Sequence, residues 1–368
     1  MNITVIGAGA WGTALAISLA PRHRTTLWGR DAEQIESMRT TRRNQRYLPD
    51  VLLSENLSLS SDFSSALADA ELLIVAVPTS ALRMTLQRII SSFPHLNPDR
   101  ATSHSTRLPR DASQVAGYLP EGEDTNEKGT VKFPDVVWLC KGFEPQTSLL
   151  PHQVAEQVLP SILHRGVLSG PSFALEVARG LPTALVLASS EEAFAQRVAR
   201  ALHHARLRIY ASNDVVGVEI GGAVKNVMAI AAGVCDGMKL GNNARAALIT
   251  RGLAEISRLG LKLGGRAETL GGLSGAGDLI LTCTGDLSRN RRVGFLLAQG
   301  QSLDEILKQI GHVAEGVYAV REVHQLAQHL EIDMPICEAV YRVLYDHVPA
   351  HEMVANLLNR TTSLEFGK

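Results

Sequence analysis

The sequence is poor in the residues that would place it in several specialised classes. Its 368 residues include four cysteines, which lie far apart and form no CxxC pair: Cys140, Cys235, Cys283 and Cys337. This spacing favours reduced thiols over a disulfide framework, and a reducing cytoplasm is the expected location. Metal-ligand spacing is missing as well, because His203 and His204 are adjacent instead of one helical turn apart. We therefore expect no metal.

An excess of positive charge and a long apolar run are also missing. Lys and Arg number 36 against 37 Asp and Glu, so no global positive field attracts nucleic acid, and an anion must bind at a local site. The most apolar stretch, 218–234, contains Glu219, Lys225 and Asn226. It is too short and too polar to span a bilayer and is expected to form a buried helix. Residues 2–6 read as a strand, which leaves no room for a signal peptide.

The pattern of the chain predicts two domains of different class. Up to about residue 210, short apolar runs alternate with amphipathic stretches, which is typical of a parallel, doubly wound α/β sheet. The expected strands are 3–6, 25–28, 72–77, 136–140, 167–169, 184–187 and 207–210. After residue 213 helical patterns replace the strands, at 217–235, 244–263, 303–310, 317–329 and 336–345. The expected domains are thus residues 1–210, α/β, and 211–368, all-α.

One polar stretch interrupts the α/β pattern. Residues 99–135 contain three prolines and the acidic run 121–124 but show no steady period, so we expect a long exposed insertion. It follows a predicted helix at 80–93 and precedes the strand at 136–140. It therefore enters at the amino-terminal edge of that strand, whereas ligands of open α/β sheets bind at the carboxyl edge. A tolerated surface insertion is the simpler interpretation, and partner binding is the alternative.

A glycine-rich turn follows the first predicted strand and carries the strongest chemical signal in this half of the chain. It reads Gly7-Ala8-Gly9-Ala10-Trp11-Gly12 and opens a helix at Thr13. In such a turn the first glycine allows the bend, the second lets the backbone approach a pyrophosphate, and the third permits close helix packing. The helix amino terminus then faces the phosphates. A tight turn without a ligand is the alternative, but the strand–turn–helix context favours a dinucleotide site.

The end of the second strand bears on the choice between NAD and NADP. A carboxylate at this place bonds the adenosine ribose and disfavours a 2′-phosphate. Arg30 stands there instead and could pair with the 2′-phosphate of NADP, although Asp31 keeps NAD possible. A solvated surface arginine is the third interpretation, so the preference stays open.

In the helical half, one lysine lies in a helix of small residues. Residues 219–233 contain four alanines, three glycines and Lys225, and small side chains let helices pack closely. We therefore expect the ammonium group to be desolvated, which lowers the pKa of a lysine toward the range of a general acid or base. A structural lysine whose head group reaches solvent is the alternative.

A second cluster in this half offers donors for a phosphate or a carboxylate. Flexible glycines at 271–277 precede Asp278, and a hydroxyl, a guanidinium and an amide follow at Ser288, Arg289 and Asn290. Two features of the first half are expected to face the same crevice. They are the turn Gly170-Pro171-Ser172 and Lys141, which follows the strand at 136–140.

Several of these motifs, in this order, make the chain resemble the bacterial-type NAD(P)-dependent glycerol-3-phosphate dehydrogenases over nearly its whole length. The matching stretches are 7–14, 141–144, 169–174, 221–227, 275–279, 282–284 and 288–291. The resemblance implies a Rossmann-type domain followed by an all-α domain like that of 6-phosphogluconate dehydrogenase. It also implies a homodimer that interconverts sn-glycerol 3-phosphate and dihydroxyacetone phosphate and supplies glycerol phosphate for phospholipid synthesis.

The resemblance also implies roles for individual residues. Lys225 matches the family's proton donor and acceptor. Substrate contacts are matched by Lys141, Gly170, Ser172, Lys225, Asp278, Ser288, Arg289 and Asn290. Beside the glycines Gly7, Gly9 and Gly12, cofactor contacts are matched by Ala10, Trp11, Arg30, Lys141, Ala174, Arg289, Val313 and Glu315. Whether Asp278 orients Lys225 or binds a substrate hydroxyl stays open.

The sequence departs from the family's pattern at the 99–135 stretch, which looks some thirty residues longer than the usual connection. This departure leaves the chemistry untouched. Two other functions remain as alternatives. A β-hydroxyacid dehydrogenase of the 6-phosphogluconate type also joins a Rossmann domain to helices, but the 288–290 cluster argues against it. A redox sensor that binds NAD(H) without turnover would not need Lys225, Asp278 and Arg289 together.

Overall fold

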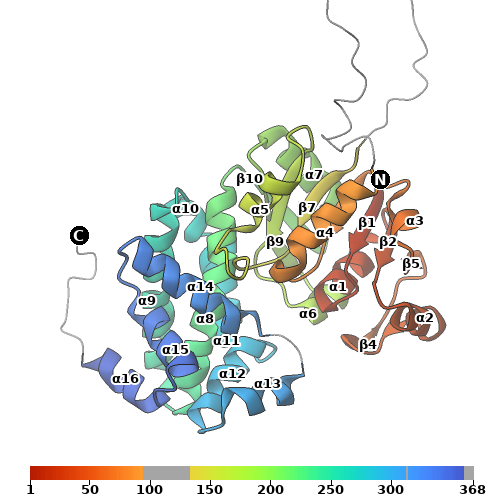
Figure 1. The fold of residues 1–368 in the computed structure, drawn as a ribbon. Coiled ribbons are helices and arrows are strands. Elements are labelled where there is room, and N and C mark those ends of the chain that lie inside the picture. The colour runs from red at the N-terminus through yellow and green to blue at the C-terminus, as the bar shows by residue number, and fades with distance from the viewer. Residues whose placement is uncertain (94–132, 312–313, 360–368) are drawn as a thin grey trace, which may run out of the picture.

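A computed structural model describes residues 1–93, 133–311 and 314–359. Its first part is built on a sheet of eight strands in the order β10-β9-β8-β7-β6-β1-β2-β5 (Figure 1). The strands are β1 (Asn2–Ile6), β2 (Arg24–Trp28), β5 (Leu57–Ser60), β6 (Leu72–Val75), β7 (Asp135–Trp138), β8 (Arg165–Ser169), β9 (Thr183–Ala188) and β10 (Leu207–Ser212). The seven strands that the sequence predicts are all present.

Helices cover both faces of this sheet, as its apolar strands require. Along β6, Leu72 and Ile74 face one apolar cluster, whereas Leu73 and Val75 face the other. The first cluster includes side chains of α1 (Ala10–Leu19), α2 (Ala32–Thr41) and α7 (Glu192–Leu202). The second includes side chains of α3 (Phe63–Leu67), α4 (Thr79–Ser91) and α5 (Pro151–Val158). The prediction of a doubly wound architecture is confirmed.

The prediction of a parallel sheet is correct for six strands and wrong for the remaining two. Strands β5, β2, β1, β6, β7 and β8 run parallel, but β9 pairs with β8 antiparallel and β10 follows the direction of β9. The short helix α6 (Ala174–Ala178) connects β8 to β9. An apolar run predicts a strand but does not show in which direction the strand runs in the sheet, so this reversal could not be predicted.

Three short strands were missed because none of them contains a continuous apolar run. β5 reads Leu57-Ser58-Leu59-Ser60 and forms one edge of the sheet. β3 (Arg43–Asn44) and β4 (Leu48–Leu52) pair antiparallel in a small ribbon beside α2 and α6. The buried carboxamide of Asn44 holds this ribbon to the glycine turn, because it donates to Ala8 O at 3.0 Å and to Thr13 Oγ1 at 2.8 Å.

In the described residues after β10, every element is a helix. They are α8 (Val215–Gly237), α9 (Gly241–Lys262), α10 (Ala267–Leu270), a π-helical turn (Leu273–Gly277), α11 (Asp278–Thr284), α12 (Arg289–Ala298), α13 (Leu303–Ile310), α14 (Glu315–His329), α15 (Pro335–Tyr345) and α16 (Ala350–Leu358). Helix α8 runs through the middle of this group (Figure 1). By length and composition it could cross a membrane, but most of it is buried inside the protein, as predicted.

The predicted insertion lies mostly outside the described residues, at 94–132. Its two described ends lie together, because the rings of Phe93 and Phe133 make an edge-to-face contact with centroids 6.4 Å apart. The chain returns directly into the start of β7, at Asp135. The insertion therefore leaves and re-enters the fold at the amino-terminal edge of that strand, as predicted.

Candidate active site

The glycine turn lies where the sheet changes its winding direction. β1 has β2 on one side and β6 on the other, and ligands of doubly wound sheets bind beside the carboxyl ends of such strands. A Cβ on Gly7 would lie 2.4 Å from Ala76 O, and one on Gly12 would lie 2.1 Å from Gly7 O. A Cβ on Gly9 would meet nothing within 4 Å. Close packing thus requires Gly7 and Gly12, whereas Gly9 faces open space where a ligand's phosphates can approach the backbone.

Further predicted cofactor residues surround this turn. Ala10 and Trp11 open α1, and Trp11 shares an apolar cluster with Ala174, the first residue of α6. Arg30 follows β2 and is exposed. The carboxylate of Asp31 caps α2 by accepting from Gln34 N at 3.1 Å. Asp31 is therefore engaged in its own helix, and Arg30 is the freer of the two side chains at the position that the sequence predicts to discriminate between NAD and NADP.

Two turns beside the same sheet edge bring Lys141 and Ser172 together. Lys141 follows the end of β7, and the backbone of Gly170, just after β8, has a φ of +133°. The Nζ of Lys141 donates to Gly170 O at 3.1 Å, and the hydroxyl of Ser172 donates to the same oxygen at 3.0 Å. The predicted convergence of Lys141 and residues 170–172 is therefore present.

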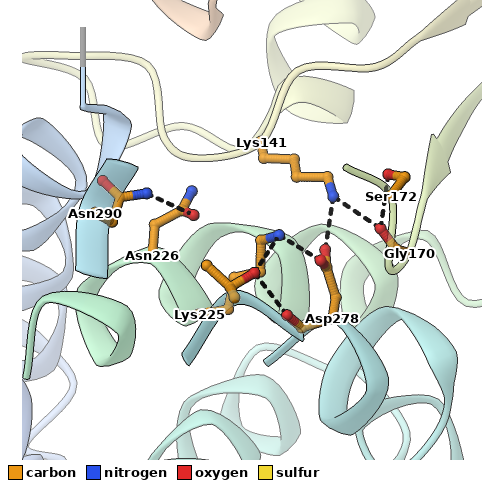
Figure 2. Close-up of polar contacts among 8 residues, drawn as sticks. Lys141, Gly170, Ser172, Lys225, Asn226, Asp278 and Asn290 are labelled. Atoms are coloured by element: carbon orange, nitrogen blue, oxygen red, sulfur yellow. Dashed lines mark hydrogen bonds and ion pairs between the residues drawn. The ribbon is translucent and has the colours of Figure 1, made fainter. Parts of the chain in front are cut away.

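The centre of the site is a carboxylate shared by two lysines (Figure 2). Asp278 begins α11, and its Oδ2 accepts from Lys141 Nζ at 2.6 Å. Its Oδ1 accepts from Nζ of Lys225, which α8 contributes. Asp278 is 1% exposed and Lys225 is 7% exposed. The α/β part thus sends one ammonium group and the helical part another to a single buried carboxylate.

Burial sets the proton affinity of Lys225. It is the main cause that lowers the pKa of Lys225 to about 8, and it outweighs the opposing effect of Asp278. The neighbouring positive charge of Lys141 lowers the pKa further. The predicted desolvation is therefore present, and both protonation states of this amine are accessible near neutral pH.

The predicted cluster of Ser288, Arg289 and Asn290 lies at the start of α12, in the same region. Ser288 caps α12, and Arg289 is exposed beside it. The carboxamide of Asn290 donates to Asn226 Oδ1 and accepts from Gly316 N, both at 3.0 Å. Asn290 thus ties the start of α14 to the residue next to Lys225.

The predicted cofactor contact Glu315 begins α14, and Val313 lies outside the described residues. Burial raises the pKa of Glu315, although the charges of Arg289, Lys141 and Lys225 oppose this shift. Those opposing charges place Glu315 in the electrostatic environment of the lysine pair.

One interpretation of the sequence is wrong. The glycines at 271–277 were expected to be flexible, but residues 273–277 form a π-helical turn packed on α8 and α10. A Cβ on Gly275 would lie 1.9 Å from Leu270 O, and one on Gly221 of α8 would lie 2.5 Å from Ser274 O. These glycines serve close packing, which brings Asp278 up to Lys225.

Sequence reasoning missed two residues of the site. Thr282 Oγ1 accepts from Lys225 Nζ at 2.9 Å and donates to Asp278 O at 2.7 Å. The second is Asn226, whose Oδ1 accepts a hydrogen bond from the carboxamide of Asn290. A signal for Thr282 was available, because a residue four positions after Asp278 lies on the same face of a helix.

Comparison with known proteins agrees with this geometry. The model of the NAD-dependent glycerol-3-phosphate dehydrogenase amino terminus matches residues 2–99 and 124–195. The model of the carboxyl terminus of the same family matches residues 214–355. The chain belongs to the NAD-dependent glycerol-3-phosphate dehydrogenase family. Residues 100–123, inside the predicted insertion, lie outside the ranges matched by these two models.

Individual members of the family match along their whole length. Glycerol-3-phosphate dehydrogenase [NAD(P)+] of Thiobacillus denitrificans is 54% identical over 366 residues, with 100% of each chain covered. The protein of the same name from Nitrosomonas eutropha is 53% identical, with 99% of each chain covered. The crystal structure of glycerol-3-phosphate dehydrogenase from Coxiella burnetii has a TM-score of 0.83 and 37% identity, and covers 98% of this chain and 99% of its own.

The residues present fit the nicotinamide dinucleotide that this dehydrogenase family uses. The open space at Gly9 and the amino terminus of α1 suit a pyrophosphate, and the exposed Arg30 lies after β2, the neighbouring strand. Metal chemistry has no comparable support, because residues 1–93, 133–311 and 314–359 hold no group of three or more potential metal ligands.

Proposed function

We propose that the protein interconverts sn-glycerol 3-phosphate and dihydroxyacetone phosphate with NAD or NADP. The observation that carries this proposal is the shared carboxylate, on which Lys141 of the α/β part meets Lys225 of the helical part. A substrate bound there lies between the dinucleotide-binding edge of the sheet and a buried amine. Full-length relatives named for this activity support the same assignment.

Lys225 is the proposed general acid and base. When bound, the dinucleotide supplies or accepts the hydride at C2 of the substrate. An ammonium group has three donors, and Asp278 and Thr282 accept from two directions. The remaining N–H is directed to the carbonyl oxygen of dihydroxyacetone phosphate and passes its proton there as the alkoxide forms. Oxidation reverses these steps, and neutral Lys225 then takes the hydroxyl proton.

Asp278 is proposed to act through the two lysines in the substrate-free protein. The sequence leaves open whether it orients Lys225 or binds a substrate hydroxyl. Its two oxygens accept from Lys225 and Lys141, which supports the orienting role. When Lys225 is protonated, the two lysines and Asp278 together carry a net positive charge, which favours an anionic substrate and a developing alkoxide.

The substrate phosphate is proposed to bind at the start of α12. Ser288, Arg289 and Asn290 bring a helix amino terminus, a guanidinium and a carboxamide to one place. Lys141, Gly170 and Ser172 are proposed to contact the other end of the substrate.

The proposed cofactor site extends from the glycine turn to the lysine pair. Its members are Gly7, Gly9, Ala10, Trp11, Gly12, Arg30, Lys141, Ala174, Arg289, Val313 and Glu315. We propose a domain boundary near residue 210, which the break between the matched ranges at 195 and 214 supports. A homodimer in the cytoplasm that supplies glycerol phosphate for phospholipids completes the proposal.

One assay separates this function from its rivals. The purified chain is mixed with dihydroxyacetone phosphate and NADPH or NADH, and the loss of absorbance at the nicotinamide band is followed. A parallel reaction contains 6-phosphogluconate and NADP. Turnover with dihydroxyacetone phosphate is the expected result. Turnover with 6-phosphogluconate alone would indicate the β-hydroxyacid dehydrogenase, and cofactor binding without any turnover would indicate a redox sensor.

A further inference from the structure

Lys141 belongs to a segment that runs from the sheet into the helical part, and we call residues 138–152 the Lys141 segment. Its ends are the last residue of β7, Trp138, and the start of α5. Between them the backbone has positive φ at Gly142 (+123°), Gln146 (+73°) and Ser148 (+54°). Two of these residues are not glycine, and L-residues rarely adopt this region. Hydrogen bonds inside the segment support this shape, from Ser148 N to Glu144 O at 3.0 Å and from Glu144 N to Leu149 O at 2.8 Å, and contacts from outside the segment add to them.

The first such contact is a buried carboxylate on α8. Glu219 is 3% exposed, and its Oε1 accepts from Trp138 Nε1 at 2.8 Å and from His152 N at 3.1 Å. Its Oε2 lies 2.6 Å from Nδ1 of His152. Burial would lower the pKa of His152, but the hydrogen bond and the charge of Glu219 outweigh it and raise that pKa. One helical side chain thus holds both ends of the Lys141 segment.

The second contact is a buried carboxylate on α14. Glu322 is 5% exposed, and its Oε1 accepts from Gln146 N at 3.3 Å. Its Oε2 accepts from the hydroxyl of Ser148. These donors belong to the two non-glycine residues with positive φ, so Glu322 binds the part of the segment that has the least favoured backbone.

Apolar side chains divide the same segment between the two parts of the protein. Phe143 and Leu150 are buried in the core of the helical part, whereas Leu149 packs against the core between the sheet and α4 and α5. From the sheet side, Arg83 of α4 binds the carboxylate of Glu144 with two donors, each at 2.8 Å. The Lys141 segment is therefore the junction on which the two parts meet.

Both carboxylates stand on helices that also carry the proposed reaction groups. Glu219 precedes Lys225 by six residues on α8, a rise of about 9 Å. Glu322 follows Glu315 by seven residues, two turns along the same face of α14. We propose that Glu219 and Glu322 are positioning residues, which hold the Lys141 segment against α8 and α14 so that Lys141 reaches Asp278. This inference rests on the proposed function.

The variants Glu219→Gln and Glu322→Gln test it, because each keeps the volume of the side chain and removes its charge. Each is expected to lower kcat for dihydroxyacetone phosphate by about tenfold to a hundredfold through misplacement of Lys141. Since Lys141 lowers the pKa of Lys225, its displacement should also move the alkaline limb of the reduction rate to higher pH. A merely structural role would leave that limb where it is.

Glu255→Gln is the matched control. Glu255 is equally buried, at 1% exposure, and accepts from two backbone groups, Ile336 N at 2.7 Å and Cys337 N at 3.1 Å. It caps α15 and does not contact the Lys141 segment. Its variant is expected to change the melting temperature while the pH profile and kcat/KM stay as in the wild type.

A double-mutant cycle with Lys141→Met decides the question. If the carboxylates act through Lys141, adding Glu219→Gln or Glu322→Gln to Lys141→Met should cost less than about twofold in kcat/KM. The proposal is overturned if the loss is equally large in both backgrounds, or if the pH limb does not move. Should Glu219→Gln fail to fold, Glu322→Gln and Ser148→Gly, which removes the hydroxyl donor, complete the cycle. Failure of the proposed function is distinct, because the wild type would then not turn over dihydroxyacetone phosphate.

Discussion

The two parts of the molecule offer their ligand-binding groups in opposite ways. At the sheet edge the proposed cofactor site is mainly backbone: an open position at Gly9 and the start of α1. In the helical part the site is made of side chains that carry charge in the interior, with Asp278 and Lys225 buried together. A backbone site depends on a local run of glycines, whereas a buried ion pair depends on residues that meet only after folding. Substitutions in the two parts should therefore impair different properties of the protein.

The largest effect is expected at Lys225. Lys225→Met keeps the length of the side chain but removes the proton donor, so kcat for dihydroxyacetone phosphate should fall by about a thousandfold. NADPH binding, followed by its fluorescence, should stay within about twofold, because the backbone site is untouched. Near-normal turnover would remove Lys225 from the proposed mechanism.

The next largest effects are expected at two glycines of the turn after β1, Gly9 and Gly12, which separate ligand binding from backbone packing within the α/β part. Gly12→Ala places a Cβ against Gly7 O and should destabilise the fold by about 1–3 kcal/mol. Gly9→Ala meets no atom within 4 Å, so its melting temperature should match the wild type while NADPH binds about tenfold or more weakly. Thermal melts and fluorescence titrations measure both. Wild-type affinity in Gly9→Ala would show that the pyrophosphate lies elsewhere.

The pH dependence of the reaction rate should arise from Lys225, in the helical part. Reduction needs protonated Lys225, so its rate should fall as pH rises through about 8, by up to about tenfold per pH unit. Oxidation needs the neutral amine, so its rate should rise over the same range. Initial rates in both directions between pH 6 and 10, at saturating cofactor, measure these two pH profiles. Profiles with the same slope in both directions would contradict the assignment.

The smallest effect is expected at Arg30, the one charged side chain proposed for the cofactor site at the end of β2. Arg30→Ala should raise KM for NADPH by about tenfold and leave KM for NADH within about twofold, since only NADP carries the 2′-phosphate. Arg22→Ala, an exposed arginine before β2, is the control. Equal losses with both cofactors would show that Arg30 does not discriminate between them.

The contrast between the two parts also explains what the sequence could predict. The glycine turn and the seven apolar strands follow from local patterns, and the desolvation of Lys225 follows from its small neighbours. Strand direction at β9 and the polar strand β5 leave no such pattern. Glu219 and Glu322 read as ordinary helical acids until their partners in the Lys141 segment are known. The glycines at 271–277 were misinterpreted as flexible, because glycine occurs both in flexible loops and where backbones pack closely.

The reversal at β9 determines where the lysine arrives. Because β9 and β10 run antiparallel to β8, the chain leaves β10 at Ser212, which pairs with Ala188, and Ala188 pairs with Val167 in the middle of β8. The chain therefore leaves the sheet in the direction away from the proposed cofactor site. Helix α8 must therefore travel the height of the sheet before it reaches the ligand edge, where Gly222 passes Ser169 and Lys141. Ten residues separate Val215 from Lys225, a climb of about 15 Å, and a five-residue strand is about as tall. Insertion or deletion of one residue in this stretch would turn the lysine by about 100° away from Asp278.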